Sequence, residues 1–137
     1  MKVYFGIDKE DFTIENHITS RYGFRALFFS TNIEVAELYA KFYAKKNKKS
    51  SAYIYEFNII EPKKKIEYNY AFSYSSNFRN LIFKGFQENI NSMMIKNVYD
   101  YPSSILKQMI LSDIIVIYDF SEIINFEKIK ILENIQF

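Results

Sequence analysis

The stretch that decides the fold of this chain is residues 21–44, which read Arg-Tyr-Gly-Phe-Arg-Ala-Leu-Phe-Phe-Ser-Thr-Asn-Ile-Glu-Val-Ala-Glu-Leu-Tyr-Ala-Lys-Phe-Tyr-Ala. A glycine-bearing turn comes first, and the apolar run from Ala26 to Ser30 predicts a short buried strand. Thr31 followed by Glu34 is a capping box, in which the threonine hydroxyl accepts the Glu34 backbone N–H. The stretch therefore predicts a strand that leads directly into a capped helix.

The helix predicted from Ile33 has an apolar stripe along one side. Its residues at i, i+3, i+4 and i+7 are Val35, Leu38, Tyr39 and Phe42. On a helical wheel Tyr39 falls near the centre of this stripe, so its ring is expected to point inward. An inward phenol most often belongs to the hydrophobic core, and it can also form the floor of a binding pocket.

The length and composition are those of one folded domain. Of the 137 residues, 49% are apolar and 19% aromatic, which is enough for a hydrophobic core. The net charge of +2 argues against a protein whose main work is coating nucleic acid. A local basic patch is compatible with that balance, and Lys45 to Lys49 form one candidate. Cations there suit either the C-terminus of a helix or the attraction of phosphate.

Cysteine is absent, and His17 is the one histidine. The chain therefore lacks a thiolate nucleophile and the usual ligands of a zinc site, so no metal is expected. The N-terminus leads straight into an apparent strand without a signal-peptide core, and no run of 18 apolar residues occurs. These features predict a cytoplasmic protein without a membrane partner, and they leave the oligomeric state open.

Strand and helix patterns follow one another along the chain without internal repeats. Strands are predicted at residues 2–5, 52–60, 92–98 and 114–118, helices at 77–89, 103–111 and 121–128, and an edge strand or docked tail at 130–137. Neither a Gly-x-Gly-x-x-Gly motif nor a P-loop occurs. The order predicts a single α+β domain over residues 1–137 with split or mixed sheets.

Several short motifs, in chain order, resemble those of the ADP-ribosyltransferase-like fold, particularly its small prokaryotic and phage-encoded members. The first motifs of that family are matched by Tyr4-Phe5-Gly6, Phe28-Phe29-Ser30-Thr31 and Val35-Ala36-Glu37-Leu38-Tyr39-Ala40. Its later strands are matched by Tyr53-Ile54-Tyr55-Glu56-Phe57, Met93-Met94-Ile95-Lys96-Asn97-Val98 and the segment from Ser112 to Ile123. The resemblance covers most of the chain.

This resemblance implies two small antiparallel or mixed β-sheets split around a cleft that binds NAD in a bent form. It implies a reaction in which nicotinamide leaves the ribose C1 through an oxocarbenium-like transition state. ADP-ribose then passes to a protein or nucleic acid acceptor. Such a site requires an aromatic ring on the nicotinamide and a carboxylate that stabilises the developing cation. A small enzyme of this kind suits a bacterial toxin or a phage anti-defence factor of the anti-CRISPR type.

The matched positions imply a set of NAD-binding residues. They are Tyr4, Phe5 and Gly6 at the nicotinamide end, Tyr39 stacked on the ring, Ser30 or Thr31 at the ribose or the catalytic acid, and Arg21 or Arg25 at the pyrophosphate. Gly6 is expected to contact the nicotinamide amide through its backbone.

The catalytic acid is the point at which the sequence departs from the family pattern. Phe5 stands where the family has histidine, and Ile114 stands where a glutamate or glutamine is expected. Asp113 is adjacent, but a one-residue slip on a strand points a side chain to the opposite face. Asp100, in a predicted loop, and Glu56, on a predicted strand, are the other candidates for the catalytic carboxylate.

Two interpretations therefore stand beside the active enzyme. A chain of the same fold without a catalytic acid is a catalytically inactive module that binds a nucleotide or a protein. An unrelated α+β module would instead present exposed aromatic residues, between Tyr68 and Tyr74, to a partner or to single-stranded nucleic acid. The enzyme predicts a carboxylate beside Tyr39, and the other two interpretations do not.

Overall fold

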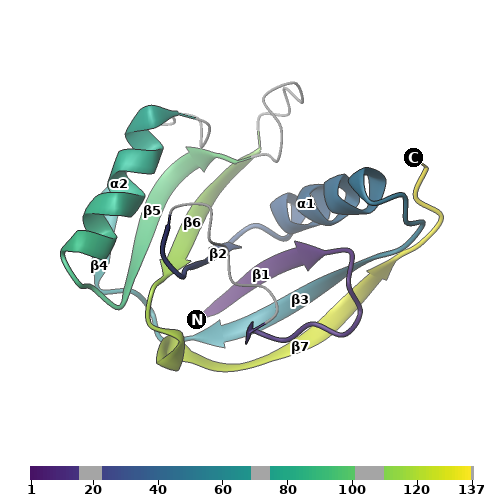
Figure 1. The fold of residues 1–137 in the computed structure, drawn as a ribbon, viewed down its shortest axis with the longest axis horizontal. Coiled ribbons are helices and arrows are strands. Elements are labelled where there is room, and N and C mark those ends of the chain that lie inside the picture. Colours follow the sequence, from purple (N-terminus) through teal and green to yellow (C-terminus); the bar gives the residue numbers. More distant parts are fainter. Residues whose placement is uncertain (16–22, 69–74, 101–109, 137) are drawn as a thin grey trace.

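A computed structural model describes residues 1–15, 23–68, 75–100 and 110–136 (Figure 1). His17, Arg21 and most of the helix predicted at 103–111 lie outside the described residues, as do most of the aromatic residues between Tyr68 and Tyr74. The last residue of that predicted helix, Leu111, belongs to a strand. No helix in the described ranges is long and apolar enough to cross a membrane.

One mixed β-sheet of seven strands forms the centre of the molecule, and its strand order is β4-β5-β6-β2-β1-β3-β7. The strands are β1 (Lys2–Ile7), β2 (Leu27–Ser30), β3 (Ala52–Ile59), β4 (Lys64–Glu67), β5 (Ser92–Tyr99), β6 (Leu111–Ile117) and β7 (Ile123–Leu132). Neighbouring strands are antiparallel, except that β4 and β5 are parallel. The predicted mixture of helices and strands is confirmed.

The prediction of two split sheets is wrong in its literal form, because the seven strands are joined in one sheet. The joint between β1 and β2 is nevertheless short, with Tyr4 and Ser30 as its single pair of register partners. By contrast, β1 pairs with β3 over six positions, from Lys2 to Ile7. The sheet thus consists of two well-paired halves, β4-β5-β6-β2 and β1-β3-β7, that meet at a narrow joint.

The described residues form two α-helices, α1 (Ile33–Lys46) and α2 (Ser76–Gln87), and a short 3-10 helix, η2 (Phe120–Glu122). The helix predicted at 77–89 corresponds to α2. The helix predicted at 121–128 is wrong, because β7 begins at Ile123 and pairs with β3 along its length. Pairing with a long neighbouring strand outweighs the weak local helical pattern there.

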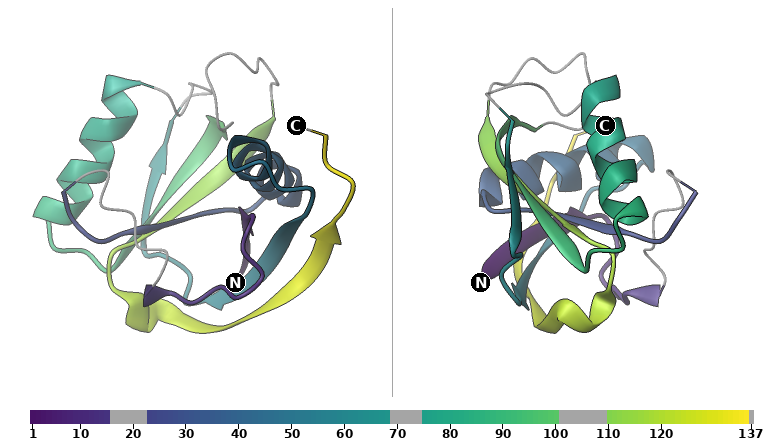
Figure 2. Two further views of the ribbon diagram at one scale, coloured as in Figure 1. Left: turned by 45° about the vertical axis from the view of Figure 1, so that its right-hand side comes forward. Right: turned by 90° about the vertical axis from the view of Figure 1, so that its left-hand side faces the viewer.

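Both α-helices cover the same face of the sheet, α1 over β1 and β3, and α2 over β4 and β5 (Figures 1 and 2). Register partners in a sheet point to the same side. Ser30 is the partner of Tyr4, which packs beside α1, and also of Ile114, which packs in the cluster that contains α2. We call this side of the sheet the helix face.

A ridge of alanines, together with Val35, fixes α1 to the sheet. Ala36, Ala40 and Ala44 are buried, whereas Tyr39 is only half-buried. Gly6 of β1 lies beneath this ridge, and a Cβ there would overlap the Ala36 carbonyl oxygen and lie 3.0 Å from the Ala40 Cβ. The small residues let the helix backbone approach the strand closely. The helix was predicted correctly, but its buried side is centred on the alanines and not on Tyr39.

The N-cap of α1 also differs from the prediction. Asn32, not Thr31, caps the helix, and its side-chain oxygen accepts the Glu34 backbone N–H at 2.9 Å. The Thr31 hydroxyl is bonded instead to the backbone of Asp113. Asparagine and threonine are both good N-caps, so local sequence does not distinguish Asn32 from Thr31. The bonds between Thr31 and Asp113 decide between the two positions.

The opposite face of the sheet is covered by an aromatic cluster. Phe5 packs there against Phe12 and Phe29, with ring centroids 5.1 and 6.1 Å away. Phe57 and Phe126 stack in parallel in the same cluster, 4.7 Å apart. Phe5 therefore points away from the helix face, because it follows Tyr4 on one strand and successive side chains alternate.

Candidate functional site

Tyr39 and Asp100 form a polar pair on the helix face. The Tyr39 hydroxyl donates a hydrogen bond to the Asp100 Oδ1 at 2.6 Å. Asp100 is only 6% exposed, and Tyr39 is half-buried. The two residues are 61 positions apart in the sequence, so the fold, and not local structure, brings them together.

Asp100 reaches this position because it follows directly after β5. Val98, two residues earlier, is fully buried among the residues under α2, so Asp100 continues on the helix face. The Asp100 backbone N–H donates to the Ile110 carbonyl at 3.2 Å, which continues the pairing of β5 with β6 past the end of the strand. The Asp100 carboxylate is thus held at the C-terminal end of β5, on the helix face that α1 covers.

A compact set of hydrogen bonds joins the end of β2 to the start of β6, and we call it the β2–β6 clasp. The side chains of Ser30 and Ser112, both buried, are bonded to each other through their hydroxyls. The Thr31 N–H donates to the Asp113 carbonyl at 3.0 Å, and the Asp113 N–H donates to the Thr31 Oγ1 at 3.1 Å. The Asn32 Nδ2 donates to the Leu111 carbonyl at 3.2 Å.

The clasp fixes where α1 begins relative to β6. Asn32 belongs to the clasp and is also the N-cap of α1. The helix therefore starts directly after two residues, Thr31 and Asn32, that are hydrogen-bonded to β6. Tyr39 lies about 10 Å further along the same helix. The clasp therefore positions the Tyr39 hydroxyl against Asp100, which lies at the same end of the β5–β6 pair as the clasp.

Ser30 and Thr31, expected at the ribose, are occupied by these bonds in this structure. The Ser30 Oγ accepts the Asn32 N–H at 3.0 Å and lies 3.0 Å from the Asn32 carbonyl, besides its contact with Ser112. Sequence reasoning missed the positioning residues Asn32 and Ser112. Ser112 belonged to a quoted motif, but nothing in the sequence indicated that its hydroxyl would meet Ser30.

The other two acidic candidates are not brought to Tyr39 and Asp100. Glu56 lies on the helix face, but β1 separates its strand from β2, so it is about 10 Å from Ser30 across the sheet. Its carboxylate pairs with Lys2 at 3.5 Å. It is therefore part of the β1–β3 half of the sheet.

Asp113 points to the face opposite Asp100, as the one-residue slip predicts. It precedes Ile114, which packs on the helix face, and its Oδ1 accepts the Asn97 N–H at 2.9 Å. Asn97 has a φ of 59° and lies where the β5–β6 register shifts. The Asp113 carboxylate thus accepts a backbone N–H at an irregular point of β5.

The residues expected to bind NAD are divided by the fold. Tyr4 is half-buried on the helix face, and Gly6 is buried beneath α1. Phe5 lies on the opposite face, in the aromatic cluster. Arg25 is exposed before the start of β2, about 16 Å along the strand direction from Ser30. Of the described members of this set, Tyr4, Ser30 and Tyr39 lie on the helix face with Asp100, and Tyr39 donates a hydrogen bond to it.

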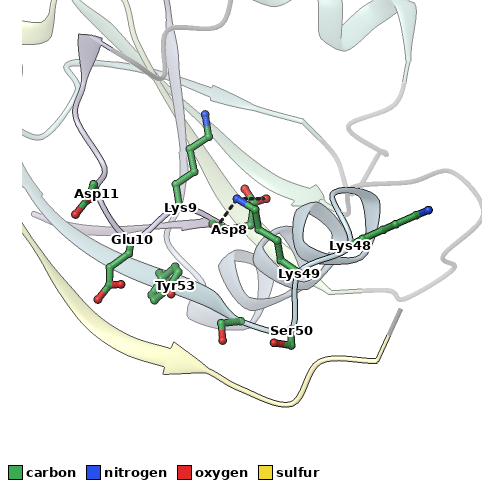
Figure 3. Close-up of a pocket in the computed structure, with 9 residues that line it drawn as sticks. Asp8, Lys9, Glu10, Asp11, Lys48, Lys49, Ser50 and Tyr53 are labelled. Atoms are coloured by element: carbon green, nitrogen blue, oxygen red, sulfur yellow. Dashed lines mark hydrogen bonds and ion pairs between the residues drawn. The ribbon is translucent and has the colours of Figure 1, made fainter.

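A second polar feature lies at the C-terminal end of α1. Figure 3 shows a hollow there, and its lining residues are Asp8, Lys9, Glu10, Asp11, Lys48, Lys49, Ser50, Ser51 and Tyr53. The Asp8 carboxylate is buried and accepts the Asn47 amide at 2.8 Å, with the Lys49 ammonium at 3.5 Å. Asp8 thus fixes the turn that follows α1.

No family model, no curated protein and no solved structure matches this chain. In the described part of the chain, no three histidine, cysteine or acidic side chains are grouped so that they could hold a metal ion. The function is therefore argued from the Tyr39–Asp100 pair and its surroundings.

Proposed function

We propose that this protein is an ADP-ribosyltransferase-like enzyme that transfers ADP-ribose from NAD to a macromolecular acceptor, with Asp100 as the catalytic carboxylate. The observation that carries the proposal is the 2.6 Å hydrogen bond between the Tyr39 hydroxyl and Asp100. It joins the aromatic residue assigned to the nicotinamide by resemblance to one of the three acidic candidates. The proposed setting is a cytoplasmic toxin or a phage anti-defence factor.

The chemistry of the proposed reaction needs a fixed negative charge near the ribose. When nicotinamide leaves, positive charge develops at C1, and a preorganised carboxylate stabilises it. Asp100 is 6% exposed, and charges interact more strongly where water is excluded. Its bond from Tyr39 holds the carboxylate in one orientation, while the half-buried ring keeps a surface that a nicotinamide can contact.

The arrangement of the sheet supports the same proposal. The two halves of the sheet meet through the single pair of Tyr4 and Ser30, and the Tyr39–Asp100 bond joins α1 to the end of β5 on the helix face. A narrow joint between two sheet halves is consistent with the split sheets that the family resemblance implies. The NAD molecule would lie on the helix face, with Tyr4 and Tyr39 at its nicotinamide end.

A second candidate function is a catalytically inactive module of the same fold that binds a nucleotide or a protein. The observation that favours it is apolar substitution at two expected polar positions. Phe5 is packed in the aromatic cluster, and Ile114 is 3% exposed between Ser30 and Ile95. In this case NAD or another nucleotide would bind without turnover.

The test measures NAD turnover and NAD binding together. Purified protein is incubated with labelled NAD and a bacterial lysate, and both labelled macromolecules and free nicotinamide are quantified. Asp100→Asn should lower transfer about 100-fold or more, because the carboxylate charge is lost while its shape is kept. Tyr39→Phe should lower it roughly tenfold, because the ring remains but a bond to a charged group is lost.

Glu56→Gln is the matched control, since it removes a carboxylate from the same face of the sheet without touching the Tyr39–Asp100 pair. It should retain transfer. Calorimetric NAD binding without any release of nicotinamide would establish the inactive module. If the wild-type protein neither binds NAD nor turns it over, the enzyme and the NAD-binding form of the inactive module are both overturned.

A further inference from the structure

The C-terminal end of α1 carries a group of lysines that take no part in the proposed reaction. We define the lysine patch as the exposed residues Lys9, Lys41, Lys45, Lys46 and Lys48. Four of them lie on α1 or in the turn after it, and Lys9 lines the same hollow as Lys48. Five positive charges are thus gathered at one end of a molecule whose net charge is only +2.

Nearby carboxylates do not neutralise this patch. Within the described ranges, no lysine of the patch has an acidic partner within 4.0 Å. The closest acids of the surrounding elements are engaged elsewhere: Glu37 with Lys130 at 2.8 Å, Glu10 with Lys128 at 3.0 Å, and Asp8 with Lys49 at 3.5 Å. Two further acids lie near the patch: Asp11 lines the hollow, and Glu133 precedes Ile135, whose N–H donates to the Ser50 carbonyl at 2.9 Å.

The end of the helix does not account for so many cations. The C-terminus of a helix carries about half an elementary negative charge, which one or two lysines complement. Lys45 and Lys46, in the last turn of α1, meet that need. Lys9, Lys41 and Lys48 are additional, and together with the other two they leave a positive surface potential.

The orientation of the side chains favours a long polyanion over a single small ion. In Figure 3 the Lys9 and Lys48 side chains extend outward and away from each other, while Lys49 turns inward to Asp8. Ammonium groups that diverge cannot close around one phosphate. They can contact successive phosphates of an extended chain, which lysines bind as point charges without reading bases.

We infer that the lysine patch is a sequence-independent docking surface for the phosphate backbone of a nucleic acid. The surface lies on the helix that carries Tyr39, and Lys46 is about 10 Å from Tyr39 along the helix axis. The inference concerns binding alone and does not depend on the transferase proposal.

The experiment measures binding of a fluorescently labelled single-stranded oligonucleotide by anisotropy, without NAD, between 50 and 200 mM salt. The wild-type affinity should be in the micromolar range at low salt, as for non-specific binding. If three or four phosphates are contacted, the affinity should fall roughly 20- to 50-fold over this range, because counterions are released. A scrambled sequence of equal length should bind equally well.

The decisive variant neutralises four lysines of the patch, Lys41→Gln, Lys45→Gln, Lys46→Gln and Lys48→Gln. Its matched control neutralises Lys63, Lys64, Lys65 and Lys84 at the other half of the molecule, where three of the four are ion-paired. Both variants change the net charge equally, and all eight side chains are exposed, so folding should be retained. Circular dichroism checks this.

The patch variant should lose at least tenfold in affinity and most of its salt dependence, while the control stays within about twofold of wild type. Equal losses in the two variants would show that only net charge matters and would overturn the inference. Equal or tighter binding of poly-glutamate of the same charge would also overturn it, by assigning the surface to acidic proteins. Salt-independent binding would contradict a phosphate contact.

Discussion

The two helices lie on the same face of one sheet, yet they are held there in different ways. α1 meets the sheet through alanines and through Gly6, so that helix backbone and strand backbone are nearly in contact. α2 meets it through large side chains, chiefly Phe78 and Ile82, which pack with Ile95 and Ile114. One helix is positioned by close backbone approach and the other by side-chain burial.

The difference explains why the candidate site is associated with α1. A helix packed through small residues has little freedom to shift, because each displacement brings backbone atoms into overlap. The β2–β6 clasp fixes its start as well. Tyr39 is therefore presented to Asp100 by a rigid support, which a functional hydrogen bond needs. α2 carries no comparable polar pair among the described residues and is held by packing.

The largest effect is expected from Gly6→Ala. The new Cβ would overlap the Ala36 carbonyl oxygen, and backbone on both sides prevents a cheap adjustment. Roughly 3–5 kcal/mol of unfolding free energy should be lost. Urea denaturation measures it, and NAD turnover should fall with it. A loss under 1 kcal/mol would show that α1 can move and would remove the contrast between the helices.

Ile82→Ala should have the next largest effect. Ile82 belongs to α2 and is fully buried between the helix and the sheet. Its truncation leaves a cavity among Ile95, Ile114 and Val116. The expected loss is roughly 2–4 kcal/mol. Because α2 contributes no residue to the clasp or to the Tyr39–Asp100 pair, any transferase activity of the folded fraction should be unchanged. The outcome that contradicts the comparison is a stable variant with impaired turnover.

The two N-caps allow a smaller and closely matched comparison. Asn32 accepts the Glu34 N–H and also donates to Leu111, whereas Ser75 accepts the Phe78 N–H at 3.1 Å and its hydroxyl contacts the Tyr68 hydroxyl at 2.7 Å. Ser75→Ala should cost about 1 kcal/mol and Asn32→Ala about 2 kcal/mol. Thermal or urea unfolding of both variants checks the order. A reversed order would mean that the clasp contributes nothing through Asn32.

Gly85→Ala should have the smallest effect. A Cβ on Gly85 would lie 2.5 Å from the Tyr118 hydroxyl, which is the far end of a side chain and donates to the Ile82 carbonyl at 2.7 Å. Displacing the tyrosine costs part of that bond, but alanine gains nearly 1 kcal/mol of helix propensity over glycine. The net change should lie within about 1 kcal/mol of zero. A loss as large as that of Gly6→Ala would show that α2 is equally intolerant.

Local patterns in the sequence were sufficient for the elements whose periodicity is strong. The strand at 52–59, the helix from Ile33 and the helix near 77–89 were predicted from the spacing of apolar residues. The strand near the weakly patterned C-terminal end was not predicted in this way, because β7 forms through its pairing with β3. The N-cap shifted by one residue because Thr31 is bonded to Asp113, 82 positions away.

The sequence by itself determined a mixed domain of helices and strands, a helix that carries Tyr39, and a short set of acidic candidates. Only the tertiary structure decided that the buried side of α1 is centred on its alanines and not on Tyr39, that Phe5 faces away, and that Asp100 is the acid beside Tyr39. The physical reason is that periodicity encodes which residues of one element can share a face. Which distant groups meet depends on strand order, register and the fit of small residues between layers.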